Sequence, residues 1–305
     1  MARSYRYLHY DVFTDHLFGG NQLAVFLDAR GLSSEQMQSI AKEMNFSEST
    51  FILPAERPDT DVRMRIFTPG GELPMAGHPV IGSTFALAQA GVIGPPRERI
   101  VFGLGVGPTP VSLMWRGSDL SFAWMTQANA TFGNPIADRA GAAAMLGVPD
   151  VAVAGTALPV QVVSSGVPYL FVPLTTRAAV DNSFLRFEAY ERLKESSKIA
   201  ATGVFVFSSQ PSSDKAAVYS RMFAPDFGIP EDPATGSACG PLGCYLVRNK
   251  VVPPKKAGSI LNLQGVKMGR PSTIHISVGF EKDEIASVRV GGEAVLAGEG
   301  TLYIN

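Results

Sequence analysis

The order of apolar and polar positions predicts strands and one amphipathic helix near the start of the chain. Residues 5–13 and 23–27 are strand-like, with apolar positions bounded by turn-forming residues. Residues 33–44 repeat apolar side chains at helical spacing after a serine that suits an N-cap. The apolar positions of that helix are Met37, Ile40, Ala41 and Met44. Polar residues 45–49 end the helix, and 50–53 return to a strand pattern.

The same order of elements recurs half a chain later. Residues 169–173 form a strand pattern, 187–194 a helical one, and 204–207 a second strand pattern. A short motif is repeated with them, because residues 65–69 read RIFTP and 221–225 read RMFAP. This recurrence predicts a duplicated domain whose two equivalent turns face one another.

Each copy of the motif leads through a Pro/Gly turn into an unusually apolar segment. The segments begin at AGHP (76–79) and TGSA (235–238), and both are predicted to be helices buried on every side. The first N–H groups of a buried helix lack acceptors, and glycine allows a ligand to approach them. Two such starts could clamp a carboxylate, and the residues concerned are Gly77, His78, Gly236 and Ser237. The alternative is that both are ordinary turns into core helices.

Length and composition favour two domains of an α+β class. The chain has 305 residues, of which 46% are hydrophobic, enough for a large core. Strand patterns dominate each half, which predicts a mixed, barrel-like sheet around a central apolar helix. The polar stretch 126–135 is the expected boundary, so we expect domains at 1–126 and 127–305. The last strand, near 301–304, is a candidate to return to the first domain.

Charge and cysteine content exclude several classes of function. The net charge is −1, with 26 basic and 27 acidic residues, so no field favours nucleic acid or an anionic membrane. The N-terminus lacks the apolar region of a signal peptide, and no apolar run of about 18 residues exists. Cys239 and Cys244 suit neither a disulfide framework nor a metal site. We therefore expect a soluble, cytoplasmic protein.

Glu48 is the first candidate for proton transfer. Strand alternation points it the same way as Thr50 and Ile52, toward a face that becomes apolar. A partly desolvated carboxyl there has a raised pKa and can exchange protons near neutrality. The alternative is a solvated turn glutamate. His78, at a glycine-flanked helix start, is a second candidate, and Asp232 is either a site residue or turn chemistry.

Several motifs together resemble the phenazine-biosynthesis PhzF-like isomerase family. They are, in order, Gly20-Asn21 with AVF at 24–26, SESTF at 47–51, ELPMAGHP at 72–79 and EDPATGSA at 231–238. The resemblance covers essentially the whole chain. It implies the diaminopimelate-epimerase-like fold, with two similar domains and an active site in the cleft between them. It also implies a cofactor-independent isomerase, often a homodimer, that acts on a small carboxylic acid and needs no metal.

The resemblance also assigns roles to individual residues. Glu48 falls on the general acid/base of the family, and Asn21 lies in one of its signatures. Residues that hold the substrate are matched by Gly77, His78, Asp232, Gly236 and Ser237. Met75 stands where phenylalanine is usual, a volume-conserving change.

Related epimerases use one cysteine at each helix start, and those positions are Ala76 and Thr235 here. Cys239 lies about one helical turn further in and is expected to pack in the core. Three functions remain open: a one-base isomerase with Glu48 as the acid/base, a racemase or epimerase with a further base, and a non-catalytic protein that binds a small acid. No nucleic acid or membrane partner is expected.

Overall fold

The computed structural model describes residues 3–282 and 284–304, in which 18 strands form one continuous mixed sheet. The strands are β1 (Arg3–Val12), β2 (Asn21–Phe26), β3 (Glu48–Pro54), β4 (Val62–Phe67), β5 (Glu72–Leu73), β6 (Arg99–Leu104), β7 (Gly107–Arg116), β8 (Asp119–Gln127), β9 (Thr131–Ile136), β10 (Val160–Ser164), β11 (Pro168–Pro173), β12 (Val204–Ser208), β13 (Val218–Ala224), β14 (Ile229–Asp232), β15 (Ile260–Gln264), β16 (Ser272–Glu281), β17 (Glu284–Gly292) and β18 (Ala294–Ile304).

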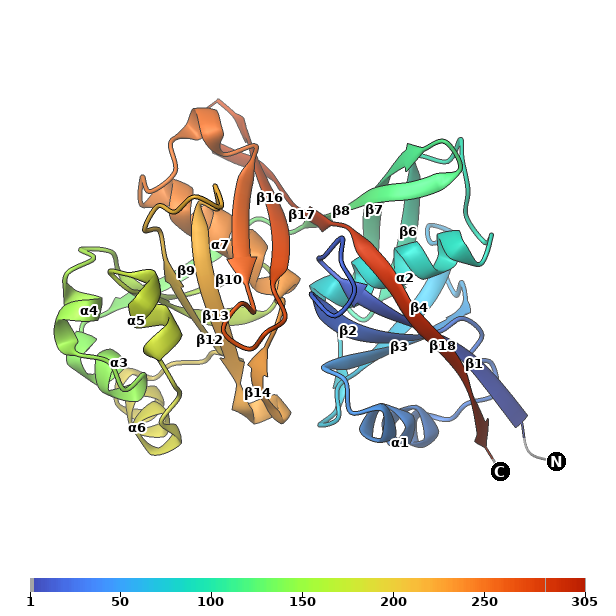
Figure 1. Cartoon of the computed structure of the whole chain (residues 1–305), viewed down its shortest axis with the longest axis horizontal. Coiled ribbons are helices and arrows are strands. Elements are labelled where there is room, and N and C mark those ends of the chain that lie inside the picture. The colour runs from blue at the N-terminus through green and yellow to red at the C-terminus, as the bar shows by residue number, and fades with distance from the viewer. Residues whose placement is uncertain (1–2, 283, 305) are drawn as a thin grey trace.

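Seven α-helices and two 3₁₀ turns accompany the strands in the described residues. The helices are α1 (Ser34–Met44), α2 (Gly77–Gln89), α3 (Arg139–Met145), α4 (Asp150–Ala154), α5 (Arg177–Asn182), α6 (Phe187–Ser197) and α7 (Gly236–Arg248), and the turns are η1 (Pro225–Phe227) and η2 (Pro254–Lys256). The fold is α+β, and its elements form two lobes that lie side by side (Figure 1).

The two halves of the molecule repeat one order of strand pairing. In the first half, β2 pairs with β3 and β4 pairs with β6 in parallel. The other pairs are antiparallel: β1 with β2, β3 with β4, β4 with β5, β6 with β7 and β7 with β8. The second half gives the same sequence of parallel and antiparallel pairs for β10–β17. The repeat seen in the sequence is therefore a repeat of topology.

Two long crossing segments join the halves. Strand β8 runs on toward β9, which pairs with β10 of the second half. Strand β17 runs on into β18, which pairs with β1 of the first half. Where they cross, β8 and β17 pair with each other (Figure 1). The C-terminal strand thus lies in the first half, and β8 ends at Gln127.

Helices α2 and α7 occupy equivalent places and are almost wholly buried. Residues 77–87 of α2 and 236–246 of α7 are all buried, as expected for helices without a charge before their last turn. Both pack into the same hydrophobic cluster, which runs continuously through the two halves. The two helix starts are consequently held by the largest core of the molecule.

The amphipathic pattern of the first half predicted α1 closely. Ser33 is its N-cap and forms a capping box with Gln36, and Asn45 ends the helix in a left-handed conformation. Helices α3, α4 and α5 have no counterpart in our sequence predictions. They have five to seven residues each, too short for a helical period to stand out. They cover the outer side of the second half in a cluster of their own.

Candidate active site in the cleft

A cavity of about 250 Å³ lies between the two lobes. Its lining combines residues of the first half, from Glu48 and 72–78, with residues of the second half, from 166–169 and 232–237. None of the described residues that line it is Lys or Arg. Backbone N–H groups in its wall are therefore the candidates to bind an anion directly.

The starts of α2 and α7 meet at the wall of this cavity. A Cβ atom on Gly77 would lie 2.5 Å from the Gly236 carbonyl carbon and from the Ser237 nitrogen, so only glycine permits this approach. Neither helix has a side-chain N-cap, since Ala76 and Thr235 make no capping hydrogen bond. The N-terminal end of a helix favours an anion, and here two such ends face one cavity.

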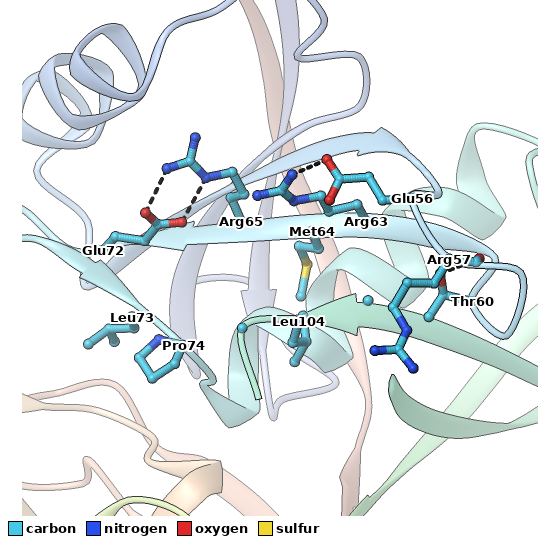
Figure 2. A pocket seen from close by; sticks show the side chains of 12 residues that line it. Glu56, Arg57, Thr60, Arg63, Met64, Arg65, Glu72, Leu73, Pro74 and Leu104 are labelled. Atoms are coloured by element: carbon cyan, nitrogen blue, oxygen red, sulfur yellow. Dashed lines mark hydrogen bonds and ion pairs between the residues drawn. The ribbon is translucent and has the colours of Figure 1, made fainter. Parts of the chain in front are cut away.

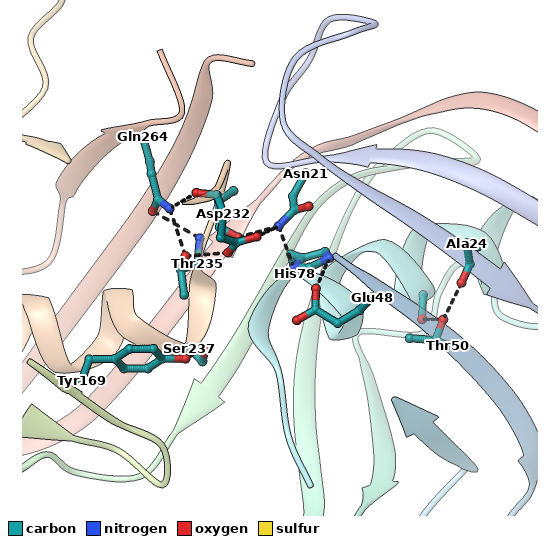
Figure 3. Close-up of polar contacts among 12 residues, drawn as sticks. Asn21, Ala24, Glu48, Thr50, His78, Tyr169, Asp232, Thr235, Ser237 and Gln264 are labelled. Carbon is teal, nitrogen blue, oxygen red and sulfur yellow. Dashed lines mark hydrogen bonds and ion pairs between the residues drawn. The ribbon is translucent and has the colours of Figure 1, made fainter. Parts of the chain in front are cut away.

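Glu48 is buried at the start of β3, with only 7% of its surface exposed. The interpretation of Glu48 as a solvated turn residue is wrong. The alternation along β3 explains its direction, because Thr50 on the same face bonds Ser83 of α2 at 2.9 Å. The carboxyl oxygen Oε2 of Glu48 lies 3.2 Å from Nε2 of His78, without the alignment of a hydrogen bond (Figure 3).

The hydrogen-bond network around His78 joins the two halves of the molecule. Asn21 donates its amide nitrogen Nδ2 to Oδ1 of Asp232 at 2.7 Å and to the Ala234 carbonyl at 3.0 Å, which sets the amide orientation. The same Nδ2 lies 3.1 Å from Nδ1 of His78, where the donor and acceptor roles depend on the tautomer of the ring. The Gln22 backbone is a further hydrogen-bond partner of His78, and Nε2 faces Glu48.

Three polar atoms at this place are buried without a hydrogen-bond partner in the described part of the chain. They are Oδ1 of Asn21, Oε2 of Glu48 and Nε2 of His78. Buried polar atoms without partners are rare and call for an explanation such as a missing ligand or a catalytic role. Their concentration in adjacent residues distinguishes this cavity from the rest of the molecule.

Asp232 closes the same network from the second half. Its Oδ2 accepts from the Thr235 hydroxyl at 2.6 Å, while Oδ1 accepts from Asn21. Gln264 fixes the turn, donating to the Asp232 carbonyl at 2.8 Å and to the Thr235 hydroxyl at 2.9 Å. Both carboxyl oxygens of Asp232 are thus engaged, unlike those of Glu48.

The structure brings the remaining expected residues to the same cleft. Ser237 lines the cavity, and its hydroxyl lies 2.7 Å from that of Tyr169. Asn21 is fully buried behind the cavity wall, where it joins Asp232 of one half to His78 of the other. Sequence reasoning did not single out Tyr169, Gln264 or the hydroxyl of Thr235. The signal for Gln264 is its place in β15, where polar Asn262 and Gln264 alternate with leucine and isoleucine.

Burial dominates the ionisation of the three titratable groups. It raises the pKa of Glu48 well above its ordinary value, and the Asp232 carboxyl adds to the effect. Burial also raises the pKa of Asp232 to about 6, against hydrogen bonds from Thr235, Asn21 and Ser47 that lower it. Burial lowers the pKa of His78 to about 3, so the imidazole is neutral at physiological pH. Glu48 and His78 therefore both favour their neutral forms in this apolar environment.

Cys239 belongs to the hydrophobic core and is not among the residues that line the cavity. It is fully buried, its thiol accepts a weak hydrogen bond from Asn262 at 3.4 Å, and burial raises its pKa to about 12. Ala76 and Thr235 are the N-cap residues of α2 and α7. Among the described residues, no group of three or more His, Cys, Asp or Glu side chains is arranged to hold a metal ion.

A second hollow lies beside the cleft and differs in character. It has a volume of about 450 Å³ and is lined by Arg57, Arg63 and Arg65 (Figure 2). Each of these arginines is paired with a neighbouring carboxylate, of Asp59, Glu56 and Glu72 respectively. With its charges satisfied internally, this hollow lacks the unpartnered groups of the cleft.

Comparison with known proteins agrees with this geometry. Residues 10–300 match the model of the family described as phenazine biosynthesis-like protein. The chain belongs to this family. It is 35% identical over 303 residues to an uncharacterized isomerase of Mesorhizobium japonicum, covering 98% of each chain. It is 34% identical over 300 residues to the trans-2,3-dihydro-3-hydroxyanthranilate isomerase of Pseudomonas aeruginosa, covering 98% of this chain and all of the relative.

Solved structures show the same fold. A PhzF-family phenazine biosynthesis protein of Bacillus anthracis superposes with a TM-score of 0.86 at 25% identity, over 98% of this chain and 99% of that one. A hydroxyproline epimerase of Agrobacterium vitis, 14% identical with a TM-score of 0.68 over 99% of this chain and 93% of that one, shares the fold alone. The α+β, epimerase-like fold expected from the sequence is confirmed.

As a member of this phenazine biosynthesis-like family, whose matching relatives are named isomerases, the protein is an isomerase. No helix in residues 3–282 or 284–304 is long and apolar enough to cross a membrane.

Proposed function

We propose that this isomerase moves a proton within a small carboxylic acid bound in the cleft, with Glu48 as general acid/base and without a cofactor. The observation that carries the proposal is the position of Glu48, a buried carboxyl of raised pKa that lines a cavity facing two helix starts. A carboxyl whose pKa approaches the working pH can both accept and return a proton.

The helix starts supply the binding of the substrate. The free N–H groups near Gly77 and Gly236 receive the substrate carboxylate, since the cavity has no cationic side chain. Negative charge that develops on the substrate when its proton leaves is stabilised by the same oriented groups. Substrate binding and stabilisation of the intermediate therefore depend on one pair of turns.

His78 and Asp232 have supporting roles in this proposal. The Nε2–H of His78 donates to Oε2 of Glu48 once the two atoms align, which favours the ionised form of Glu48 needed to accept a proton. Asp232 holds Asn21 and Thr235 in place and has no free oxygen for proton transfer. A single base returns its proton to the face from which it came, so the reaction is a shift between two carbons.

The second half offers no second base at the position equivalent to Glu48. Phe51 pairs with Arg65, and Val206 pairs with the equivalent Arg221. Glu48 stands three residues before Phe51, and Gly203 stands three residues before Val206. Epimerisation, the second candidate, would have to use Asp232, whose raised pKa is the one observation in its favour. We also propose a cytoplasmic homodimer of two-domain chains, divided at residues 126 and 127, on the family resemblance.

The test follows the proton in deuterated water, with trans-2,3-dihydro-3-hydroxyanthranilate as the first probe because a relative is named for it. We expect nuclear magnetic resonance to show hydrogen transferred between carbons, with deuterium entering only as far as Glu48 exchanges its proton. Inversion at one carbon with deuterium incorporation would favour the epimerase. Binding of this probe, or of other small cyclic acids, without conversion would favour a binding protein.

A further inference from the structure

The repeated motif carries a matched pair of ion pairs that the isomerase chemistry does not use. In the first half, Arg65 donates through Nε and Nη2 to the two carboxyl oxygens of Glu72, at 2.7 and 2.6 Å (Figure 2). In the second half, Arg221 donates in the same way to Glu231, at 2.8 Å for both bonds. We call these pairs the first fork and the second fork.

In each fork the glutamate lies in a short strand, and the residue that follows the glutamate lines the cavity. Glu72 precedes Leu73 in β5, and Glu231 precedes Asp232 at the end of β14. Leu73 and Asp232 line the cavity, Glu231 is not among the lining residues, and Glu72 lines both the cavity and the second hollow. Each glutamate precedes its helix-start glycine, Gly77 or Gly236, by five residues.

The surroundings of the forks are also repeated. Arg65 stacks over Phe67 and Arg221 over Phe223, each with the guanidinium carbon 5.0 Å from the ring centre. Each arginine also reaches the helical connection that precedes the neighbouring strand, β3 or β12. Arg65 bonds the Ser34 hydroxyl at the start of α1, at 2.9 Å. Arg221 bonds carbonyls at the end of α5, including those of Val180 at 3.1 Å and Ser183 at 2.5 Å.

The forks act on strands that are too short to hold their own position. β5 has two residues and β14 four, and each pairs with a single neighbour. Bidentate arginine–carboxylate bonds are directional and about twice as strong as neutral hydrogen bonds. The turns that the forks span also meet at the mouth of the cleft, where a Cβ on Gly70 would lie 3.0 Å from the Phe227 carbonyl.

The two forks differ in exposure. The Arg221 and Glu231 side chains are 9% and 18% exposed, and those of Arg65 and Glu72 are 15% and 43% exposed. An exposed ion pair is weakened by salt, and a buried one much less. Arg221 also has backbone partners that Arg65 lacks. The first fork is therefore the weaker of the two.

We propose that Arg65–Glu72 and Arg221–Glu231 are positioning pairs that hold the two cavity-lining segments, 72–78 and 231–237, against the substrate. The second fork keeps its wall fixed. The first fork is the salt-sensitive one, and its release lets residues 72–78 move away from the second half. The inference rests on the proposed function for its kinetic consequence, but the motion itself concerns the free protein.

The test compares Glu72→Gln with Glu231→Gln by amide hydrogen exchange in the ligand-free protein. Asp28→Asn is the matched control, because Asp28 forms a similar two-bond pair with Arg30 away from the cleft. We expect Glu72→Gln to raise exchange in residues 72–78 about tenfold, with the thermal midpoint unchanged, and 1 M salt to do the same to the wild type. We expect Glu231→Gln to raise exchange in 231–237, and the control to raise neither.

Kinetics give the second measurement. With any converted acid as probe, we expect Glu72→Gln to raise KM with a smaller change in kcat, and Glu72→Asp to restore part of the loss. Unchanged exchange in 72–78 in Glu72→Gln, or an equal rise across the whole chain, would refute the positioning role. The exchange result is independent of turnover, so failure of the proposed isomerisation would leave it standing, and the reverse also holds.

Discussion

The two halves of this molecule have the same strand order but contribute opposite chemistry to the cleft. When the strand pairs of the two halves are aligned by their registers, Glu48 occupies the same position as Gly203, and Asn21 the same position as Val167. They also make Leu73, paired with Ile66, equivalent to Asp232, paired with Met222. In each of these pairs, a polar residue in one half has a non-polar counterpart in the other.

This complementarity shows how a duplicated fold makes a single site. The repeated features surround the cleft: the forks, the glycines and the apolar helices. The differing features include the titratable side chains Glu48 and Asp232, so the symmetric scaffold holds a different candidate group in each half. Burying a second unpaired carboxyl opposite the first would be costly, because two neighbouring carboxylates cannot both ionise easily. Substitutions in each half test this difference.

The largest effect is expected from exchanging the two buried carboxyls one at a time. Glu48→Gln should lower kcat at least about a hundredfold, the usual scale of general acid–base catalysis, while the fold and ligand binding persist. Asp232→Asn should mainly raise KM, because that carboxyl holds Asn21, Thr235 and Ser47 in place. Steady-state kinetics on a converted acid measure both. An active Glu48→Gln enzyme beside an inactive Asp232→Asn enzyme would reverse the roles of the two halves.

The next effect concerns the contact between the repeated glycines. Gly77→Ala places a Cβ 2.5 Å from backbone atoms of the other half, so it should lower the free energy of unfolding by about 1–3 kcal/mol. Gly94→Ala is the control, since its Cβ meets nothing within 4 Å. Denaturant unfolding compares them. Equal stability of the two variants would mean that the helix starts do not meet in solution.

A smaller effect is expected from acid. Burial lowers the pKa of His78 to about 3, so between about pH 6.5 and 3 the unfolded chain binds a proton that the folded chain excludes. Stability contributed by neutral His78 is present above pH 6.5 and is lost as the pH falls. Glu48 and Asp232 act in the opposite sense, because their raised pKa values favour folding at low pH and lose that contribution as pH rises.

His78→Gln isolates the histidine from the carboxyls. Between pH 7.5 and 4.5, the wild type should lose more unfolding free energy than His78→Gln, as measured by urea unfolding at both values. Parallel losses in the two proteins would show that His78 is not held neutral by burial.

The smallest effect is expected at Cys239. Cys239→Ala should keep turnover within about twofold, because the thiol is fully buried, has a pKa raised to about 12 and bonds only Asn262. Initial rates give the comparison with Glu48→Gln. A dead Cys239→Ala enzyme beside an active Glu48→Gln enzyme would restore a thiol mechanism.

Much of the fold and site was predictable from local patterns. The capping serine and apolar stripe of α1, the apolar runs of α2 and α7, and the repeated motif all depend on neighbours within a few residues. Strand alternation placed Glu48 beside Thr50 and Ile52 on the face toward α2. The sequence did not predict the short helices α3–α5, because fewer than two helical turns show no hydrophobic period.

What the sequence by itself determined is which segments form strands and buried helices, and that one half repeats the other. Only the tertiary structure decided that Asn21 lies within hydrogen-bonding distance of both His78 and Asp232, 211 residues away from the latter. It also decided that Tyr169 meets Ser237 and that β18 returns to β1. The physical reason is that period and capping are local, whereas a hydrogen bond between halves requires the crossing of β8 and β17 to bring them together.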